Sequence, residues 1–172
     1  MKKYLGFIIL SVFILGIGLA NAETRITLEK VFTQITPLFM KGHQGDMASI
    51  EGFEFSGDIL LNGSKIGDFN GTASLLNPPL MASERYDQGI TKFENTIYGM
   101  GQFDVCAQIT TLGNINGIDP GQAIFGWHGS IANGSNTLKG LAGISTGSGS
   151  FSLFNLNGTG QETLIYTFET TE

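Results

Sequence analysis

Apolar and polar residues alternate with a period of two along several stretches of the chain. The alternation is clearest over residues 69–75, 103–109, 125–131 and 163–168. Apolar side chains then share one face and most polar ones share the other, which is typical of antiparallel strands with one covered face. Roughly eight such segments, separated by turn signals, predict an all-β fold, either a sandwich or a barrel.

Asn-Gly dipeptides supply many of these turn signals. They occur five times, at residues 62–63, 70–71, 116–117, 133–134 and 157–158. Asn and Gly both tolerate a positive φ at low cost, so each dipeptide favours a tight hairpin turn. A glycine-rich patch over residues 140–149 is expected to form a flexible or closely packed turn region.

One segment near the start of this pattern is ambiguous. From Glu29 to Met40, the residues Val31, Ile35 and Leu38 recur at helical spacing, whereas Pro37 interrupts a helix at that point. Two interpretations remain open, a first strand with an irregular pattern or a short helix that caps the barrel.

The N-terminal residues have the pattern of a signal peptide. Lys2 and Lys3 precede an uncharged apolar run over residues 4–20, and Ala20-Asn21-Ala22 places small residues where a signal peptidase cleaves. An uncleaved membrane anchor is the alternative, but the run is slightly short for a span of roughly 20 residues. We therefore expect residues 1–22 to be removed and residues 23–172 to form a single exported domain, periplasmic or secreted, with no membrane partner after cleavage.

The charge of the chain argues against nucleic acid as a partner, and its cysteine content excludes an intrachain disulfide. The whole chain has 9 basic and 15 acidic residues, and the expected cleavage removes two of the basic ones. Nucleic acid is not an expected partner, because Lys and Arg must replace the counterions of phosphate groups. Cys106 is the single cysteine, so no intrachain disulfide can form, and a lone cysteine in a strand pattern is expected to be inert.

Glycine-rich motifs in the second half carry a family resemblance. The segment from Ile131 to Gly143 reads I-A-N-G-S-N-T-L-K-G-L-A-G. It resembles the segment I-x-G-G-T-G-x-F-x-G-A-x-G of the allene oxide cyclase and dirigent barrels. Residues 56–73 are similar to a hairpin of that family ending in G-x-x-x-G-x-A, and residues 163–168 resemble its closing strand. The likeness spans about residues 50–169.

This resemblance implies an eight-stranded antiparallel β-barrel related to the calycins, which can hold one small apolar ligand. Known members cyclise reactive intermediates or steer radical coupling by the shape of their pocket. The chain departs from the family in two respects. Ala142 stands where dirigents carry an arginine, and the dirigent disulfide is impossible. Glu29 is a possible match for the catalytic glutamate of the cyclases.

Other catalytic patterns give weak signals. The segment from Gly143 to Gly147 matches the G-x-S-x-G elbow of hydrolases, but no histidine follows Ser145 to complete a triad. His43 and His128 lie too far apart to form a ligand-spaced pair. Asn114, Asn116 and Asp119 are read as a turn, not as a calcium loop. No metal and no cofactor are expected.

The predicted interior supplies the candidate site. The alternation points a set of aromatic and polar side chains inward, namely Phe93, Asn95, Phe103, Trp127, Glu162 and Tyr166. An amide or carboxylate on an apolar face needs a partner, since burying it unpaired costs roughly 1–3 kcal/mol. Asn95, Tyr166 and Glu162 are therefore candidates for orienting a ligand. The alternative is that the aromatic rings fill the core while Asn95 and Glu162 lie at strand ends in water.

Three functions are compatible with this sequence. The first is a small exported barrel that binds a small hydrophobic molecule inside. The second is a cofactor-free cyclase or isomerase that acts by pocket shape. The third is a filled structural barrel whose outer surface binds another protein.

Overall fold

The computed structural model describes residues 23–40, 49–75, 85–113, 122–152 and 154–168, and it shows an all-β protein. Its eight strands are β1 (Thr24–Met40), β2 (Ser49–Leu61), β3 (Ser64–Leu75), β4 (Arg85–Ile97), β5 (Gly101–Gly113), β6 (Gln122–Ala132), β7 (Leu141–Ser152) and β8 (Asn157–Phe168). A short 3-10 helix, η1 (Asn136–Leu138), lies between β6 and β7. The expected signal peptide, residues 1–22, lies outside the described residues.

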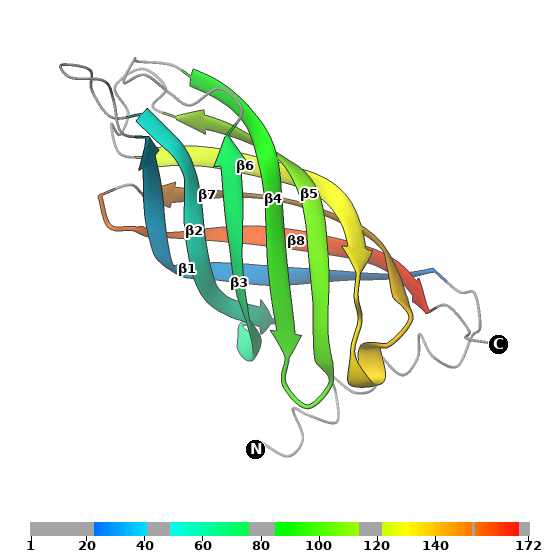
Figure 1. The fold of residues 1–172 in the computed structure, drawn as a ribbon. Helices are drawn as coiled ribbons and strands as arrows, with labels where there is room; N and C mark the ends of the chain where they lie inside the picture. Colours follow the sequence, from blue (N-terminus) through cyan, green and yellow to red (C-terminus); the bar gives the residue numbers. More distant parts are fainter. Residues whose placement is uncertain (1–22, 41–48, 76–84, 114–121, 153, 169–172) are drawn as a thin grey trace.

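The strands close into an antiparallel barrel in which each strand pairs with its neighbours in the sequence (Figure 1). The one pairing between strands distant in the sequence is that of β1 with β8, which runs from Thr24 opposite Tyr166 to Phe32 opposite Gly158. The prediction of an all-β fold is confirmed, and the barrel form of it is the one observed.

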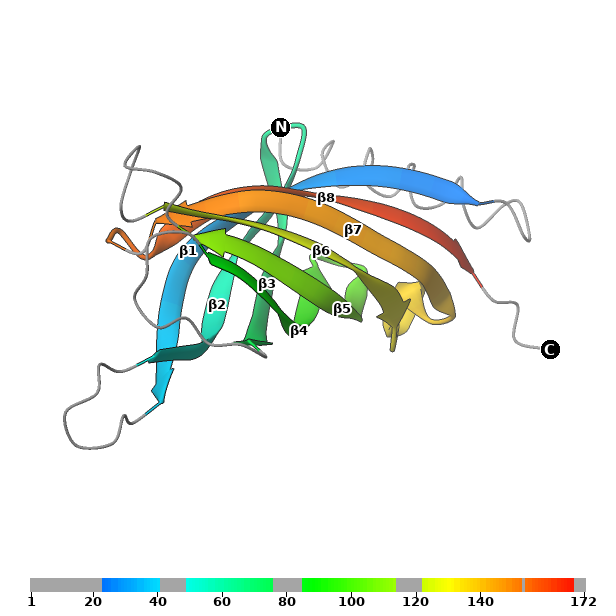
Figure 2. The same cartoon turned by 90° about the horizontal axis from the view of Figure 1, so that it is seen from above.

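The ambiguous segment belongs to β1, so the alternative of a capping helix is wrong. Its pattern is irregular because the pairing with β2 shifts between Phe32 and Gln34, leaving Thr33 as an extra residue. Buried positions are even-numbered before this β-bulge and odd-numbered at Ile35 after it. Pro37 is tolerated because β1 pairs with β8 only as far as Phe32, so one edge of the strand is open there. Figure 2 shows β1 bending strongly along its length.

Only part of the turn prediction is confirmed. Asn62 and Gly63 have φ values of 51° and 73° and form the two-residue connection of β2 to β3. Asn70-Gly71 lies inside β3 and residues 141–149 belong to β7, so both were wrongly predicted as turns. Asn157-Gly158 begins β8, and residues 116–117 lie outside the described residues.

Glycines inside the strands make room for the aromatic core. Gly147 lies directly opposite Trp127 on β6, and a Cβ atom there would be 2.2 Å from the indole ring. Gly149 has the same relation to Phe125. These residues were predicted as a turn because their lack of side chains resembles turn composition, whereas here it lets the large rings lie flat across the neighbouring strand.

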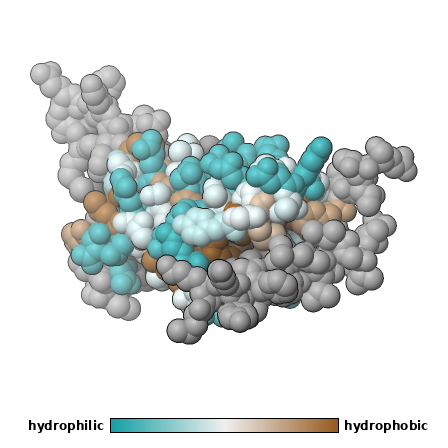
Figure 3. Space-filling view, turned by 90° about the horizontal axis from the view of Figure 1, so that it is seen from below, coloured by the Kyte–Doolittle hydropathy of each residue, from teal (hydrophilic) through white to brown (hydrophobic). Residues whose placement is uncertain are grey.

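The outer face is largely polar. In the view of Figure 3, most of the described surface is hydrophilic or of intermediate hydropathy, with smaller hydrophobic areas. Cys106 and His128 are both exposed. Within the described residues, no helix combines the length and the hydropathy needed to cross a membrane.

Candidate functional site

Five polar or amphipathic side chains meet inside the barrel, each from a different strand. They are Lys30 on β1, Asn95 on β4, Trp127 on β6, Ser145 on β7 and Glu162 on β8, and we call them the interior network. None of them is more than 4% exposed. They reach the interior because each lies at an inward position of its strand, in line with apolar neighbours.

The network forms one continuous chain of contacts. The indole Nε1 of Trp127 donates to Ser145 Oγ at 3.0 Å, and Ser145 Oγ donates to Glu162 Oε1 at 2.6 Å. The other carboxylate oxygen, Oε2, lies 3.0 Å from Lys30 Nζ. Nζ in turn donates to Asn95 Oδ1 at 2.6 Å. Buried charges require such pairing, because an isolated charge costs several kcal/mol of desolvation.

Lys30 is held between two aromatic rings. Its Nζ lies 4.5 Å from the ring centroid of Phe69 and 4.6 Å from that of Phe93, distances at which a cation is attracted to the π-face. Burial lowers the pKa of Lys30, while the carboxylate of Glu162 opposes that shift. The amine is therefore closer to its neutral form than an exposed lysine at the same pH.

Asn95 leaves its amide nitrogen, which carries two N–H donors, unused. Its Oδ1 must face Lys30, because a lysine ammonium offers donors and no acceptor. This fixes Nδ2 on the other side of the amide, where it has no hydrogen-bond partner in the structure although Asn95 is 0% exposed. A buried orphan donor costs about 1–3 kcal/mol, so Nδ2 is ready to bind an acceptor oxygen.

An apolar cavity of about 30 Å³ lies between the network and one end of the barrel. It is lined by Phe32, Ile35, Phe53, Phe55, Ala73, Phe93, Ile109, Thr111, Phe125, Trp127 and Phe151. Its volume admits one or two waters and is far below the roughly 300–1,000 Å³ of a drug-sized site. Aromatic rings thus occupy most of the interior, and a larger ligand must displace one of them.

The rings of Phe93 and Trp127 connect the cavity to the network. Both line the cavity, and they meet edge to face with centroids 5.4 Å apart. Phe93 also covers Lys30 Nζ, and Trp127 donates to Ser145. Phe93 and Trp127 therefore form the boundary between the apolar cavity and the polar network.

The predicted site residues divide into two groups. Phe93, Asn95, Trp127 and Glu162 are brought together through Lys30 and Ser145, and Asn95 and Glu162 are buried, not at strand ends in water.

The remaining two candidates, Phe103 and Tyr166, are both 1% exposed. Phe103 lies directly across from Asn95 on β5. Tyr166 lies four residues beyond Glu162 on β8, near Phe168, and burial raises the pKa of its phenol to about 12.

Sequence reasoning missed Lys30 and placed Ser145 in the predicted turn region of residues 140–149. Lys30 continues the inward series Ile26 and Leu28, a signal that the β-bulge at Thr33 obscured. Ser145 lies within strand β7, and its hydroxyl donates a hydrogen bond to the carboxylate of Glu162. Glu29, the possible counterpart of a catalytic glutamate, points outward and is exposed.

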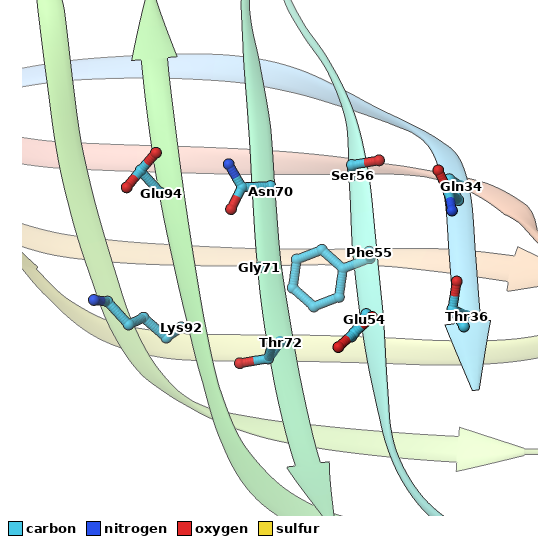
Figure 4. Close-up of a pocket in the computed structure, with 10 residues that line it drawn as sticks. All are labelled: Gln34, Thr36, Glu54, Phe55, Ser56, Asn70, Gly71, Thr72, Lys92 and Glu94. Atoms are coloured by element: carbon cyan, nitrogen blue, oxygen red, sulfur yellow. The ribbon is translucent and has the colours of Figure 1, made fainter. Parts of the chain in front are cut away.

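A second hollow lies on the outer face of β1 to β4. It has a volume of about 420 Å³ and is open to solvent. Figure 4 shows its lining, which is Gln34, Thr36, Glu54, Phe55, Ser56, Asn70, Gly71, Thr72, Lys92 and Glu94. Its polar side chains are exposed, apart from Ser56, which is half-buried, so solvent already satisfies them and this hollow is the weaker candidate. The described residues contain no group of acidic, cysteine or histidine side chains suited to a metal ion.

Comparison with known proteins leaves the family open. No protein-family model matches the chain, and no curated protein matches it.

Proposed function

We propose that the protein binds a small, mostly apolar molecule inside the barrel, with an acceptor oxygen of that molecule on Asn95 Nδ2. The observation that carries the proposal is the unpaired, fully buried amide nitrogen of Asn95, two residues along β4 from Phe93, which lines the aromatic cavity. A ligand oxygen that accepts a hydrogen bond from Asn95 Nδ2 removes the energetic penalty of this buried, unpaired donor, and this gain favours binding. The aromatic lining supplies the apolar contact area.

The apolar part of the ligand must be slim. The cavity already contains about 30 Å³ of free space, and the ring of Phe93 separates it from Lys30. Rotation of this one ring joins the cavity to the network. An unbranched chain of several carbons with one oxygen at its end fits this shape better than a fused-ring molecule.

The sequence supports the wider setting of this proposal. The N-terminal pattern of residues 1–22 supports an exported protein, periplasmic or secreted. The motifs between residues 56 and 168 support a place among the allene oxide cyclase and dirigent barrels. Sequencing of the N-terminus of the protein from its own organism tests export, with Glu23 as the expected first residue.

Trp127 provides the test of binding, because it is the only tryptophan and lines the cavity. We expect 1-hexanol to shift the emission of Trp127 in a saturable way. Asn95→Leu keeps the branched shape of the side chain but removes the amide, both the Nδ2 donor and the Oδ1 acceptor of Lys30, and it should weaken hexanol binding about tenfold, equivalent to about 1.4 kcal/mol.

Two phenylalanine substitutions on adjacent residues give the matched control. Ala73→Phe fills the cavity and should abolish the hexanol response, whereas Ser74→Phe points outward and should leave it unchanged. If 1-hexanol leaves the emission unchanged, or if both substitutions act alike, the interior is a filled core and the structural alternative holds.

An isomerase or cyclase is the second candidate, and the buried pair of Lys30 and Glu162 favours it. A carboxylate and an amine 3.0 Å apart can pass a proton between them. Hexan-2-one in deuterated buffer tests this function, because an isomerase that removes a proton next to a carbonyl exchanges that hydrogen. Exchange seen by NMR should fall in Glu162→Gln, and absence of exchange in the unmodified protein rejects this candidate.

A further inference from the structure

We propose that Lys30 forms a reversible imine with an apolar aldehyde or ketone that enters through the interior cavity. This inference rests on the proposed binding function and names the chemical class of the ligand. It assigns Lys30 a covalent role that an ordinary ion pair does not have.

Lys30 differs in kind from the other lysines of the described ranges. Lys65, Lys92 and Lys139 are exposed, and Lys30 is 1% exposed. Two aspartates, Asp58 and Asp68, bind Lys65 and raise its pKa, which keeps that amine protonated. Burial acts in the opposite direction on Lys30 and lowers its pKa. An unprotonated amine in an apolar setting is the form that attacks a carbonyl carbon.

Access to the amine depends on one side chain. The ring of Phe93 lies 4.6 Å from Nζ on one side and lines the cavity on the other. A carbonyl compound in the cavity therefore reaches Nζ once this ring turns aside. The second ring over Nζ, that of Phe69, does not line the cavity and stays as the back wall.

The groups around Nζ match the steps of imine formation. Glu162, 3.0 Å away, first takes the proton of the ammonium. The nitrogen lone pair then forms a bond to the carbonyl carbon, and the oxygen, bound by Asn95 Nδ2, takes a proton from that nitrogen to give a neutral carbinolamine. Glu162 gives its proton to the hydroxyl, the carbon–oxygen bond breaks and water leaves, and the Glu162 carboxylate takes the remaining proton from the nitrogen. Amine and carbonyl thus give imine and one water, with no oxidant or reductant.

Trapping with hexanal and sodium cyanoborohydride at neutral pH tests the inference. Cyanoborohydride reduces the imine to a stable hexyl amine, which intact-mass measurement counts and peptide mapping locates. We expect the first hexyl group on Lys30, at least tenfold faster than on Lys65, Lys92 or Lys139. Lys92→Met is the matched control and should leave this fast phase unchanged, whereas Lys30→Met should remove it.

Phe93→Leu keeps the test decisive if Lys30→Met fails to fold. It opens the path to Nζ without touching the ion pair, and it should raise the trapping rate at Lys30 several-fold. Equal labelling of the exposed lysines, with Lys30 unmodified in protein that still binds 1-hexanol, overturns the imine and leaves the binding function intact. Failure to bind either compound overturns both.

Discussion

At the residue scale, Lys30 and Glu162 form a buried ion pair. Their side chains are 1% and 0% exposed, respectively. Removing one partner leaves the other charge buried and uncompensated, so Lys30→Met or Glu162→Gln alone should each lower the free energy of unfolding by about 3–5 kcal/mol. The double variant buries no charge and should recover most of that loss. Urea unfolding followed by the emission of Trp127 measures all three, and additive losses would contradict the pairing.

Ionisation of Tyr166 should lower the stability of the fold at alkaline pH. Burial raises the pKa of its phenol from the ordinary value of 10.0 to about 12. The folded state therefore keeps this proton at a pH where the unfolded state has lost it. The stabilisation is complete below pH 10 and is lost as the pH rises from 10 towards 12. Urea unfolding across this range should show a smaller decline for Tyr166→Phe than for the unmodified protein.

At the element scale, the β-bulge at Thr33 keeps both halves of β1 facing the core. Deleting Thr33 gives Ile35 the same parity as Lys30 and Phe32, so both halves of β1 should still face the core in a regular strand paired with β2. We expect this deletion to fold and to lose only the local bend and twist that a bulge adds, judged by circular dichroism and cooperative urea unfolding. Thr33→Ala should stay within about 0.5 kcal/mol, as for other exposed positions. A deletion variant that fails to fold would show that barrel closure requires the bend at the bulge.

The pairing of β6 with β7 depends on a glycine opposite Trp127. In Gly147→Ala the new Cβ atom would lie 2.2 Å from the indole and 2.5 Å from the carbonyl oxygen of Gln161, so we expect a loss of about 1–3 kcal/mol. Gly126 is the matched control, because the nearest atom to its Cβ would be 3.5 Å away. Gly126→Ala should be neutral in thermal unfolding, and equal effects at both sites would contradict the packing argument.

The same features explain what the sequence could predict. Regular alternation over Phe103 to Ile109 correctly identified a strand and its inward face, because a covered antiparallel strand imposes that period directly. A bulge changes the parity within one strand, so the alternation failed at β1 and hid Lys30. Glycines are frequent in turns, but they also occur in strands where a large ring lies opposite. The glycines of β7 therefore led to the wrong prediction of a turn. The partners of Asn95 and Glu162 depend on register across strands distant in sequence.

For the whole molecule, closure of the barrel depends on one long-range pairing, β1 with β8. Every other pair joins consecutive strands, and closing the large loop costs entropy before contacts repay it. We expect Leu164→Ala on β8 chiefly to speed unfolding, while Ile59→Val in the β2–β3 hairpin also slows folding. Stopped-flow kinetics followed by Trp127 separates the two. A folding rate that falls more for Leu164→Ala than for Ile59→Val would place closure early.

Because β1 pairs with β8, the barrel does not depend on which strand comes first in the sequence. Thr24 lies directly opposite Tyr166, so the two ends of the barrel sequence are neighbours that a short linker can join. New ends can then be opened at the exposed Asn62-Gly63 turn. Such a circularly permuted chain begins with β3 and ends with β2, yet it encloses the same five network side chains, because the barrel is a ring of strands.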